Sequence, residues 1–329
     1  MNYLLVGRRE LLAFLGLLLA FVAVRVPGFG LPFHQDEWKI AEIVRSQIVG
    51  GIAAHPPLTE LIFRWSGYFI DASYLRIVPL TFGVISAPLL YVVVRRRAGT
   101  LSAYVALALY TVCVYGVYAS LMIDTDGAIL PTFFLLAVYA YDRFRDAASS
   151  RASFAWACGI AAAIFLGIMV KLSFVLVLGA LALDYMIEMR SRLTRALIVR
   201  IILATTICAA VALTVIASMQ IFSPAFNVGK IIEHVLLYVR FDGRGYLQVL
   251  VQGVKALFYL SPLLLAPLIF ISKETLTKNR IFAVYLGVGI VFYFVLFDFS
   301  QAALDKYLMY SIIPLSAIVG TIIADLVRG

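Results

Sequence analysis

Repeated apolar stretches of about 20 residues limit what this chain can fold into. A hydrocarbon layer ~30 Å thick needs about that many residues of α-helix to cross it. The chain has 329 residues and is 63% hydrophobic, well above the roughly one half that is typical of a soluble domain. A membrane β-barrel would show alternating segments of about 10 residues, whereas these runs are unbroken. The sequence therefore predicts an all-α polytopic membrane protein.

Ten membrane spans are predicted from these runs. They are expected at residues 10–28, 74–94, 100–121, 126–141, 153–170, 172–188, 198–218, 252–272, 281–299 and 307–326. The first run follows Arg8 and Arg9 as a signal peptide would, but no small-residue cleavage site follows it, so we expect an uncleaved span. Two intervening segments, 29–73 and 219–251, are too long and too polar to be simple turns. We expect one domain over 1–329.

Basic residues predict the orientation of these spans, because cytoplasmic loops carry an excess of Lys and Arg. With the N-terminus in the cytoplasm, 16 of the 27 basic and 7 of the 18 acidic residues fall on the cytoplasmic side. The net charge of +9 then lies wholly on that face, and the outer face is neutral. The basic composition thus reflects membrane topology and gives no sign of nucleic-acid binding. Both long segments lie outside, where we expect the chemistry.

The first outer segment carries an acidic pair followed by two amphipathic patterns. "DEWKIAEIVRSQIVGG" begins at Asp36 and Glu37 and predicts a short helix that ends at the Gly50–Gly51 turn. "HPPLTELIFRW" begins at His55 and predicts a second helix from Leu58 onward. Both are expected to lie in the membrane interface. By local pattern alone, the acidic pair could simply cap the first helix.

A second acidic motif, "DTDG", stands where the third span ends and the fourth begins. It contains Asp124 and Asp126. Ionisable groups at membrane depth are costly, and they usually mark a functional site. An ordinary polar turn is the alternative interpretation of this motif.

Taken in order, these motifs resemble the protein mannosyltransferase and aminoarabinose transferase superfamily. That superfamily consists of integral membrane glycosyltransferases with the GT-C fold. The likeness rests on the "DE" pair, "HPPLTELIFRW", "LRIVPLTFGVISAPLLYVVVRRRAG", "DTDGAILPTFFLLAVYAYDRF", "GIMVKLSFVLVL", "RFDGRGYLQVLVQGVKALFYLSPLLLAPL" and "KYLMYSIIPLSAIVG". It covers nearly the whole chain. The chain is short for the superfamily, and we expect it to lack the final spans and the C-terminal extramembrane domain of relatives.

The resemblance implies roles for particular residues. Asp36 matches the catalytic acid, Glu37 lies beside it, and Asp126, or else Asp124, matches the second acid. The positions implied to bind the donor phosphate are His55, Lys171, Arg240 and Lys306. Arg244, a further arginine predicted on the outer side, is assigned the same role. Tyr307 is a further candidate, although it and Lys306 could instead be interfacial anchors, and Lys171 could be a snorkelling lysine.

The implied activity is transfer of a sugar from a polyprenyl-phosphate donor to a lipid, glycan or protein acceptor on the outer face. Asp36 would act as general base, cationic side chains would stabilise the departing phosphate, and the anomeric centre would be inverted. No cofactor is required by the pattern. A divalent cation held by Asp36, Glu37, Asp126 or His234 is an open alternative, although His234 is better explained as an ordinary helix residue. Ala54 replaces a Glu of some relatives, which weakens the case for a metal.

Two other classes of membrane protein share some of these features. A transporter or lipid flippase would also have about ten spans, but it should show paired, similar halves and interrupted helices at the midplane, and we find no internal repeat. A polysaccharide polymerase or ligase would use lipid-linked sugars, but its charged residues would gather in a large late outer loop. Here the first outer segment is the richer one.

The predicted topology can be tested by labelling single cysteines in a variant from which Cys113, Cys158 and Cys208 have been removed. A cysteine at Ser46 should react with an impermeant thiol reagent applied from outside, because the first long segment is predicted to lie there. A cysteine at Ser191 should not react. Labelling of the Ser191 position from outside would contradict the topology.

Overall fold

The computed structural model is a helical bundle, and it describes residues 7–46, 56–189, 246–296 and 308–328, with a few single positions between 213 and 236. Its α-helices are α1 (Arg8–Ala23), α2 (Gln35–Ser46), α3 (Pro57–Gly67), α4 (Ile77–Ala98), α5 (Thr100–Val112), α6 (Val114–Ala119), α7 (Ile129–Arg145), α8 (Ser150–Val170), α9 (Val175–Met189), α12 (Tyr246–Tyr259), α13 (Pro262–Leu265), α14 (Lys273–Lys278), α15 (Arg280–Ile290) and α17 (Ile312–Arg328). Shorter 3-10 turns are η1 (Val26–Gly30), η2 (Ala72–Tyr74), η3 (Leu172–Phe174), η4 (Ala266–Phe270) and η6 (Leu308–Ser311), and a π-helical segment, Val291–Leu296, follows α15. The described residues contain no strand.

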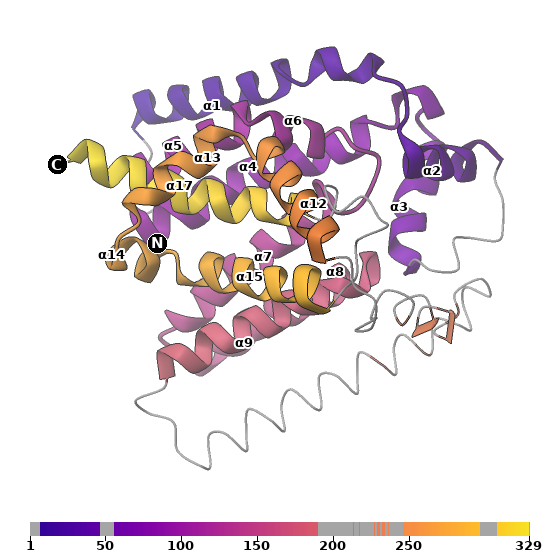
Figure 1. Cartoon of the computed structure of the whole chain (residues 1–329). Coiled ribbons are helices and arrows are strands. Elements are labelled where there is room, and N and C mark those ends of the chain that lie inside the picture. The colour runs from indigo at the N-terminus through magenta and orange to yellow at the C-terminus, as the bar shows by residue number, and fades with distance from the viewer. Residues whose placement is uncertain are drawn as a thin grey trace.

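Two helices form the centre of the bundle. Helix α17 packs along α5 and is buried from Ile312 to Thr321. Helix α7, buried over most of its length, packs against α4 and α8 (Figure 1). Helix α1, in contrast, exposes leucines such as Leu12 and Leu19. Because these large apolar side chains face outward, the surface is suited to hydrocarbon rather than water.

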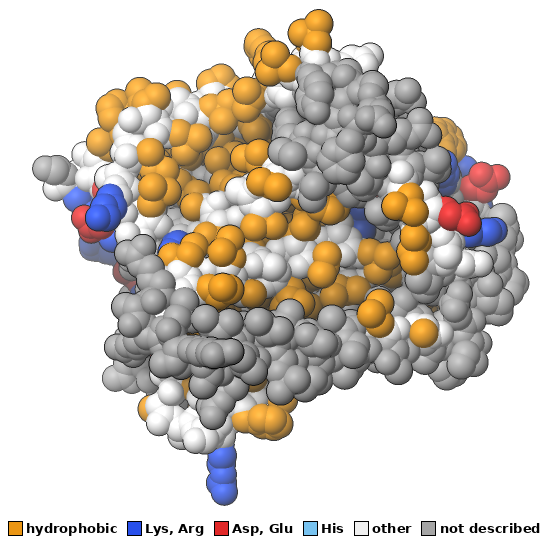
Figure 2. All heavy atoms as spheres, turned by 60° about the horizontal axis from the view of Figure 1, so that its bottom comes forward, with side chains coloured by type: hydrophobic (Ala, Val, Ile, Leu, Met, Phe, Trp, Pro, Cys, Tyr) orange, Lys and Arg blue, Asp and Glu red, His pale blue; other side chains and the backbone are white. Residues whose placement is uncertain are grey.

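An apolar band crosses the face seen in Figure 2, with charged side chains at its two ends. Five of the described helical segments are long and apolar enough to cross a membrane: Arg8–Gly30, Ala72–Ala98, Ser150–Val170, Leu172–Met189 and Leu308–Arg328. This confirms a polytopic, all-helical membrane architecture, although it does not confirm ten continuous spans. The predicted span 198–218 lies almost wholly outside the described residues.

The predicted span at 252–272 is wrong as a single helix. The chain breaks at Ser261, whose φ of 74° is in the left-handed region, and continues as α13 and η4. Pro262 explains the break, because a proline disfavours the helical conformation of the residue before it. The Ser261 hydroxyl then accepts a hydrogen bond from the Leu263 N–H and caps α13. The predicted span 100–121 is likewise divided at Cys113 into α5 and α6.

One end of the bundle, which we call the basic end, contains the C-terminal end of α4, the connection from α7 to α8, α14 and the C-terminus of α17 (Figure 1). Ion pairs join its helices: Arg97 of α4 pairs with Asp142 of α7, and the Arg280 Nε lies 2.6 Å from Asp184 of α9. These are segments that the charge distribution assigned to the cytoplasm. Their meeting at one end agrees with the predicted alternation of spans, while the side of the membrane stays a prediction.

The opposite end, which we call the site end, contains α2, α3, the 120–128 connection, η3 and η6 (Figure 1). Helices are found where the two amphipathic patterns of the first long segment predicted them, α2 at Gln35–Ser46 and α3 at Pro57–Gly67. Their location in a membrane interface stays a prediction, and the Gly50–Gly51 turn between them lies outside the described residues.

Candidate functional site

The Glu37 carboxylate is buried at the start of α2, with 1% of the residue exposed. Its Oε2 accepts a hydrogen bond of 2.6 Å from the His34 N–H, the residue that precedes the helix. A glutamate at the third helical position that reaches back to the capping residue is half of a capping box. This local contact explains why the chain turns into a helix at Gln35.

Arg76, just before α4, is the ionic partner of Glu37. Its guanidinium donates to both carboxylate oxygens, at 2.7 and 3.0 Å, and also to the carbonyls of Leu31, Pro32 and Leu121. Taking an ion pair out of water is costly unless the remaining polar groups are hydrogen-bonded. Here one guanidinium holds two separate backbone segments, residues 31–32 and residue 121, around the pair.

Glu37 also connects the two acidic motifs. Its Oε1 accepts a hydrogen bond of 2.8 Å from the N–H of Ile123, which directly precedes Asp124. Residues 124–126 are all buried, and the Asp124 carboxylate accepts from the Thr125 N–H at 2.6 Å. Gly127 lies so close to α6 that a Cβ there would be 2.0 Å from the Ala119 carbonyl oxygen, so only glycine allows this connection to pack.

Lys171 and Asp126 form an ion pair beside this connection. The Nζ lies 2.5 Å from Oδ2, with the lysine side chain 16% and the aspartate side chain 5% exposed. The preceding Val170 carbonyl, at the end of α8, accepts a hydrogen bond of 2.7 Å from Thr59 of α3. Helix α3 of the first long segment is thereby attached beside Lys171. Lys171, for which snorkelling was the alternative, is thus paired with a carboxylate inside the protein, and its role at a donor site stays a prediction.

Arg25 binds the backbone and side chains next to the second acidic motif. It was not predicted from the sequence. It is fully buried, and its Nε donates to the Ser120 hydroxyl at 2.5 Å. It also donates to the carbonyls of Tyr110 and Thr111, at 3.2 Å each, where α5 ends. These carbonyls lack helical partners at a helix end, so Arg25 caps α5 and holds the turn that leads to the second acidic motif. An arginine inside the first apolar run is the sequence signal that could have identified it.

Several predicted site residues cannot be placed. Asp36 lies in the first turn of α2, next to Glu37, but its side chain is outside the described part of the structure. His55, Arg240, Arg244, Lys306, Tyr307 and His234 also lie outside it. Within the described ranges, no three His, Cys, Asp or Glu side chains gather as a metal site. The structure thus brings together Glu37, Asp124, Asp126 and Lys171.

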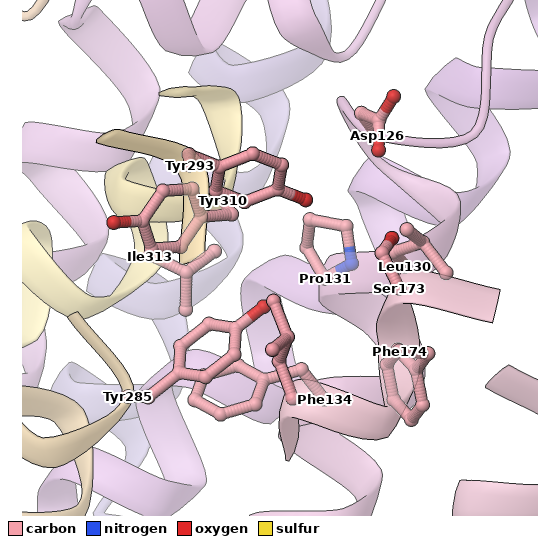
Figure 3. Close-up of a pocket in the computed structure, with 11 residues that line it drawn as sticks. Asp126, Leu130, Pro131, Phe134, Ser173, Phe174, Tyr285, Tyr293, Tyr310 and Ile313 are labelled. Carbon is pink, nitrogen blue, oxygen red and sulfur yellow. The ribbon is translucent and has the colours of Figure 1, made fainter. Parts of the chain in front are cut away.

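A narrow pocket lies beneath Asp126, toward the bundle centre (Figure 3). Its walls come from the start of α7, from η3 and the start of α9, and from α15, the π-helical segment, η6 and the start of α17. The lining residues are Asp126, Leu130, Pro131, Phe134, Ser173, Phe174, Leu176, Tyr285, Tyr293, Tyr310 and Ile313. Most of this lining is aromatic or aliphatic, with a carboxylate at one edge, a composition typical of small-molecule sites.

Two crystal structures of ArnT from Cupriavidus metallidurans are similar to this chain in fold. The structure bound to undecaprenyl phosphate superposes with a TM-score of 0.67 and the apo structure with 0.65, and both are 16% identical in sequence. The match covers 94% of this chain. The chain has the GT-C fold. It spans 60% of the length of ArnT. No protein-family model matches the sequence, and neither does any curated protein.

The contacts of Glu37 predict that Glu37→Gln strongly destabilises the protein. The amide would place an N–H₂ against donors from Arg76 and the backbone, and breaking a buried ion pair costs about 3–5 kcal/mol. We expect the melting temperature of the detergent-solubilised protein to fall by roughly 5 °C or more. Glu60→Gln is the matched control, because Glu60 pairs with Arg64 on the partly exposed surface of α3 and such pairs contribute less than about 1 kcal/mol. Equal melting temperatures for the two variants would contradict a structural role for the Glu37 pair.

Proposed function

We propose that this protein is a membrane glycosyltransferase that moves a sugar from a polyprenyl-phosphate donor to an acceptor at the site end. The observation that carries the proposal is the joining of the two acidic motifs within a GT-C fold. Glu37 of the first motif binds the backbone beside Asp124 of the second, and the Asp126–Lys171 pair lies next to them. The ArnT structure with undecaprenyl phosphate supports a lipid phosphate as part of the donor.

The first step of the proposed reaction is deprotonation of the acceptor. Asp36 takes the proton from an acceptor hydroxyl or amine, whose lone pair then attacks the anomeric carbon of the sugar. A positioned general base is worth typically 10²–10⁴-fold in rate. As the new bond forms, the bond from the anomeric carbon to the phosphate oxygen breaks, and the polyprenyl phosphate leaves with the electron pair. Attack opposite the leaving group inverts the anomeric centre.

Cationic side chains stabilise the departing phosphate in this proposal. Lys171 is the described member of the set, and its pairing with Asp126 holds the ammonium in place before the donor arrives. Charge that is fixed in advance stabilises a transition state without reorganisation. His55, Arg240, Arg244 and Lys306 are proposed to share this role, with Tyr307 as a further contact and His234 as a candidate metal ligand.

Glu37 takes a different role from its neighbour. In the sequence, Glu37 lies beside the residue that matches the catalytic acid and is one of the candidate ligands for a divalent cation. Its four hydrogen bonds instead support a positioning role, in which Glu37 holds the first turn of α2 against the second acidic motif. We propose that this contact also holds Asp36, one position earlier on that turn, near Asp126. Two adjacent carboxylates then serve two functions, one structural and one chemical.

The proposal predicts that Asp36→Asn abolishes sugar transfer while leaving the melting temperature nearly unchanged, because the amide keeps the size and polarity of the side chain but accepts no proton. Purified protein would be incubated with a panel of polyprenyl-phosphate sugars and cell-envelope acceptors, and the products identified by mass spectrometry. Glu42→Gln, the same kind of change at an exposed position of α2, is the control and should retain transfer. If Asp36→Asn keeps more than about a tenth of wild-type turnover, Asp36 is not the base. If the wild-type protein transfers no sugar from any donor, the proposed function itself fails.

A further inference from the structure

The hydroxyl of Tyr285 is a buried polar group in the lining of the pocket beneath Asp126. The residue is 9% exposed, and its ring is fixed by stacking on Phe134, with centroids 4.2 Å apart and planes at 21°. Its hydroxyl has no hydrogen-bond partner among the described residues and points toward the middle of the pocket (Figure 3). Buried polar groups are nearly always hydrogen-bonded in native proteins, so this one is suited to a bound molecule.

Neighbouring tyrosines show the contrast. Tyr310 also lines the pocket, but its hydroxyl donates to the Leu286 carbonyl at 3.2 Å, away from the cavity. Its ring fits against α15 only because residue 289 is glycine, where a Cβ would lie 2.3 Å from the Tyr310 ring. Tyr310 therefore contributes an aromatic wall, and Tyr285 contributes a hydroxyl that can donate a hydrogen bond to a bound molecule.

The part of the pocket wall that contains Tyr293 has a π-helical backbone. Tyr293 is 5% exposed and lies within the π-helical segment Val291–Leu296. Such segments are rare and are found frequently at functional sites. Its ring lies 5.4 Å from that of Tyr310, centroid to centroid. This observation is independent of the Tyr285 hydroxyl and points to the same pocket.

We propose that this pocket is the subsite for the ring of the sugar that is transferred. This inference rests on the proposed function. A sugar ring has C–H faces that pack on aromatic rings and hydroxyls that hydrogen-bond, here with the Tyr285 hydroxyl and the Asp126 carboxylate. The pocket is narrow, so the proposal requires the wall formed by Tyr293 and Tyr310 to move outward when the ring binds.

The polar groups of the pocket argue against the other parts of a lipid-linked donor. A prenyl chain offers no hydrogen bond to Tyr285 and would cover the Asp126 carboxylate with hydrocarbon, which is unfavourable. A phosphate is better held by the Lys171 ammonium, which is not part of the pocket lining. A neutral ring with hydroxyls satisfies both groups. With the phosphate at Lys171, the anomeric carbon would lie at the rim of the pocket, between Lys171 and the second acidic motif.

The test compares binding of two probes to the protein in lipid nanodiscs: undecaprenyl phosphate alone, and the undecaprenyl-phosphate sugar that the wild-type protein transfers. Tyr285→Phe should weaken binding of the sugar-bearing lipid about 3- to 10-fold, the effect of one hydrogen bond, and leave binding of undecaprenyl phosphate unchanged. Tyr91→Phe is the matched control, because Tyr91 is another tyrosine of similar burial, 5% exposed, outside the pocket. It should change neither affinity.

A second variant fills the pocket. Ser173→Leu should abolish binding of the sugar-bearing lipid while the protein still binds undecaprenyl phosphate. Equal affinities of wild type and Tyr285→Phe for the sugar-bearing lipid would overturn the inference, and so would an equal loss for both probes. Either result, with wild-type transfer intact, would leave the proposed function standing. Absence of transfer by the wild type would instead contradict the proposed function.

Discussion

The ion pair between Glu37 and Arg76 is buried away from water, and the site end is arranged around it. Each partner would be costly alone, since an unpaired buried charge destabilises a fold by several kcal/mol. The pair is tolerated because the carboxylate accepts two backbone N–H groups besides the guanidinium, and the guanidinium donates to three carbonyls. The polar backbone of an irregular region is thus satisfied inside the protein, as a membrane environment demands.

Arg25 likewise satisfies polar backbone groups inside the protein, at the end of α5. Helix α5 stops short of the site end, and the carbonyls it leaves unpaired are taken by Arg25. The same guanidinium holds Ser120, and Arg76 takes the carbonyl of Leu121, the next residue. Two arginines therefore fix both sides of the turn before Asp124. The bundle provides rigid walls, and these cations position a short polar connection where chemistry can take place.

Hydropathy and charge predicted the architecture well, because each depends on local composition. The apolar runs identified the helices, and the basic residues identified which helix ends gather together. The acidic motifs were recognisable from their position at span ends. The residues that hold them in place were not, because Arg25 and Arg76 depend on contacts 39 to 95 residues away in the chain. The sequence does contain one sign of the Arg76 contact, because a cation at a helix N-terminus is unfavourable with the helix dipole and is stabilised by an acid nearby.

Hydropathy gave a wrong prediction at 252–272, where Pro262 interrupts an apolar run. Tyr285 is one of 18 tyrosines, and only the fold distinguishes it.

The most direct test of the account is amide hydrogen exchange of the peptide spanning residues 119–128, followed by mass spectrometry, in wild-type protein and in Glu37→Gln. The Ile123 N–H is bound by a side chain 86 residues away in sequence, so loss of that carboxylate should speed exchange in this peptide as well as in α2. Glu60→Gln should leave the 119–128 peptide at the wild-type rate. Unchanged exchange of this peptide in Glu37→Gln, with faster exchange confined to α2, would contradict the claim that Glu37 joins the two acidic motifs into one site.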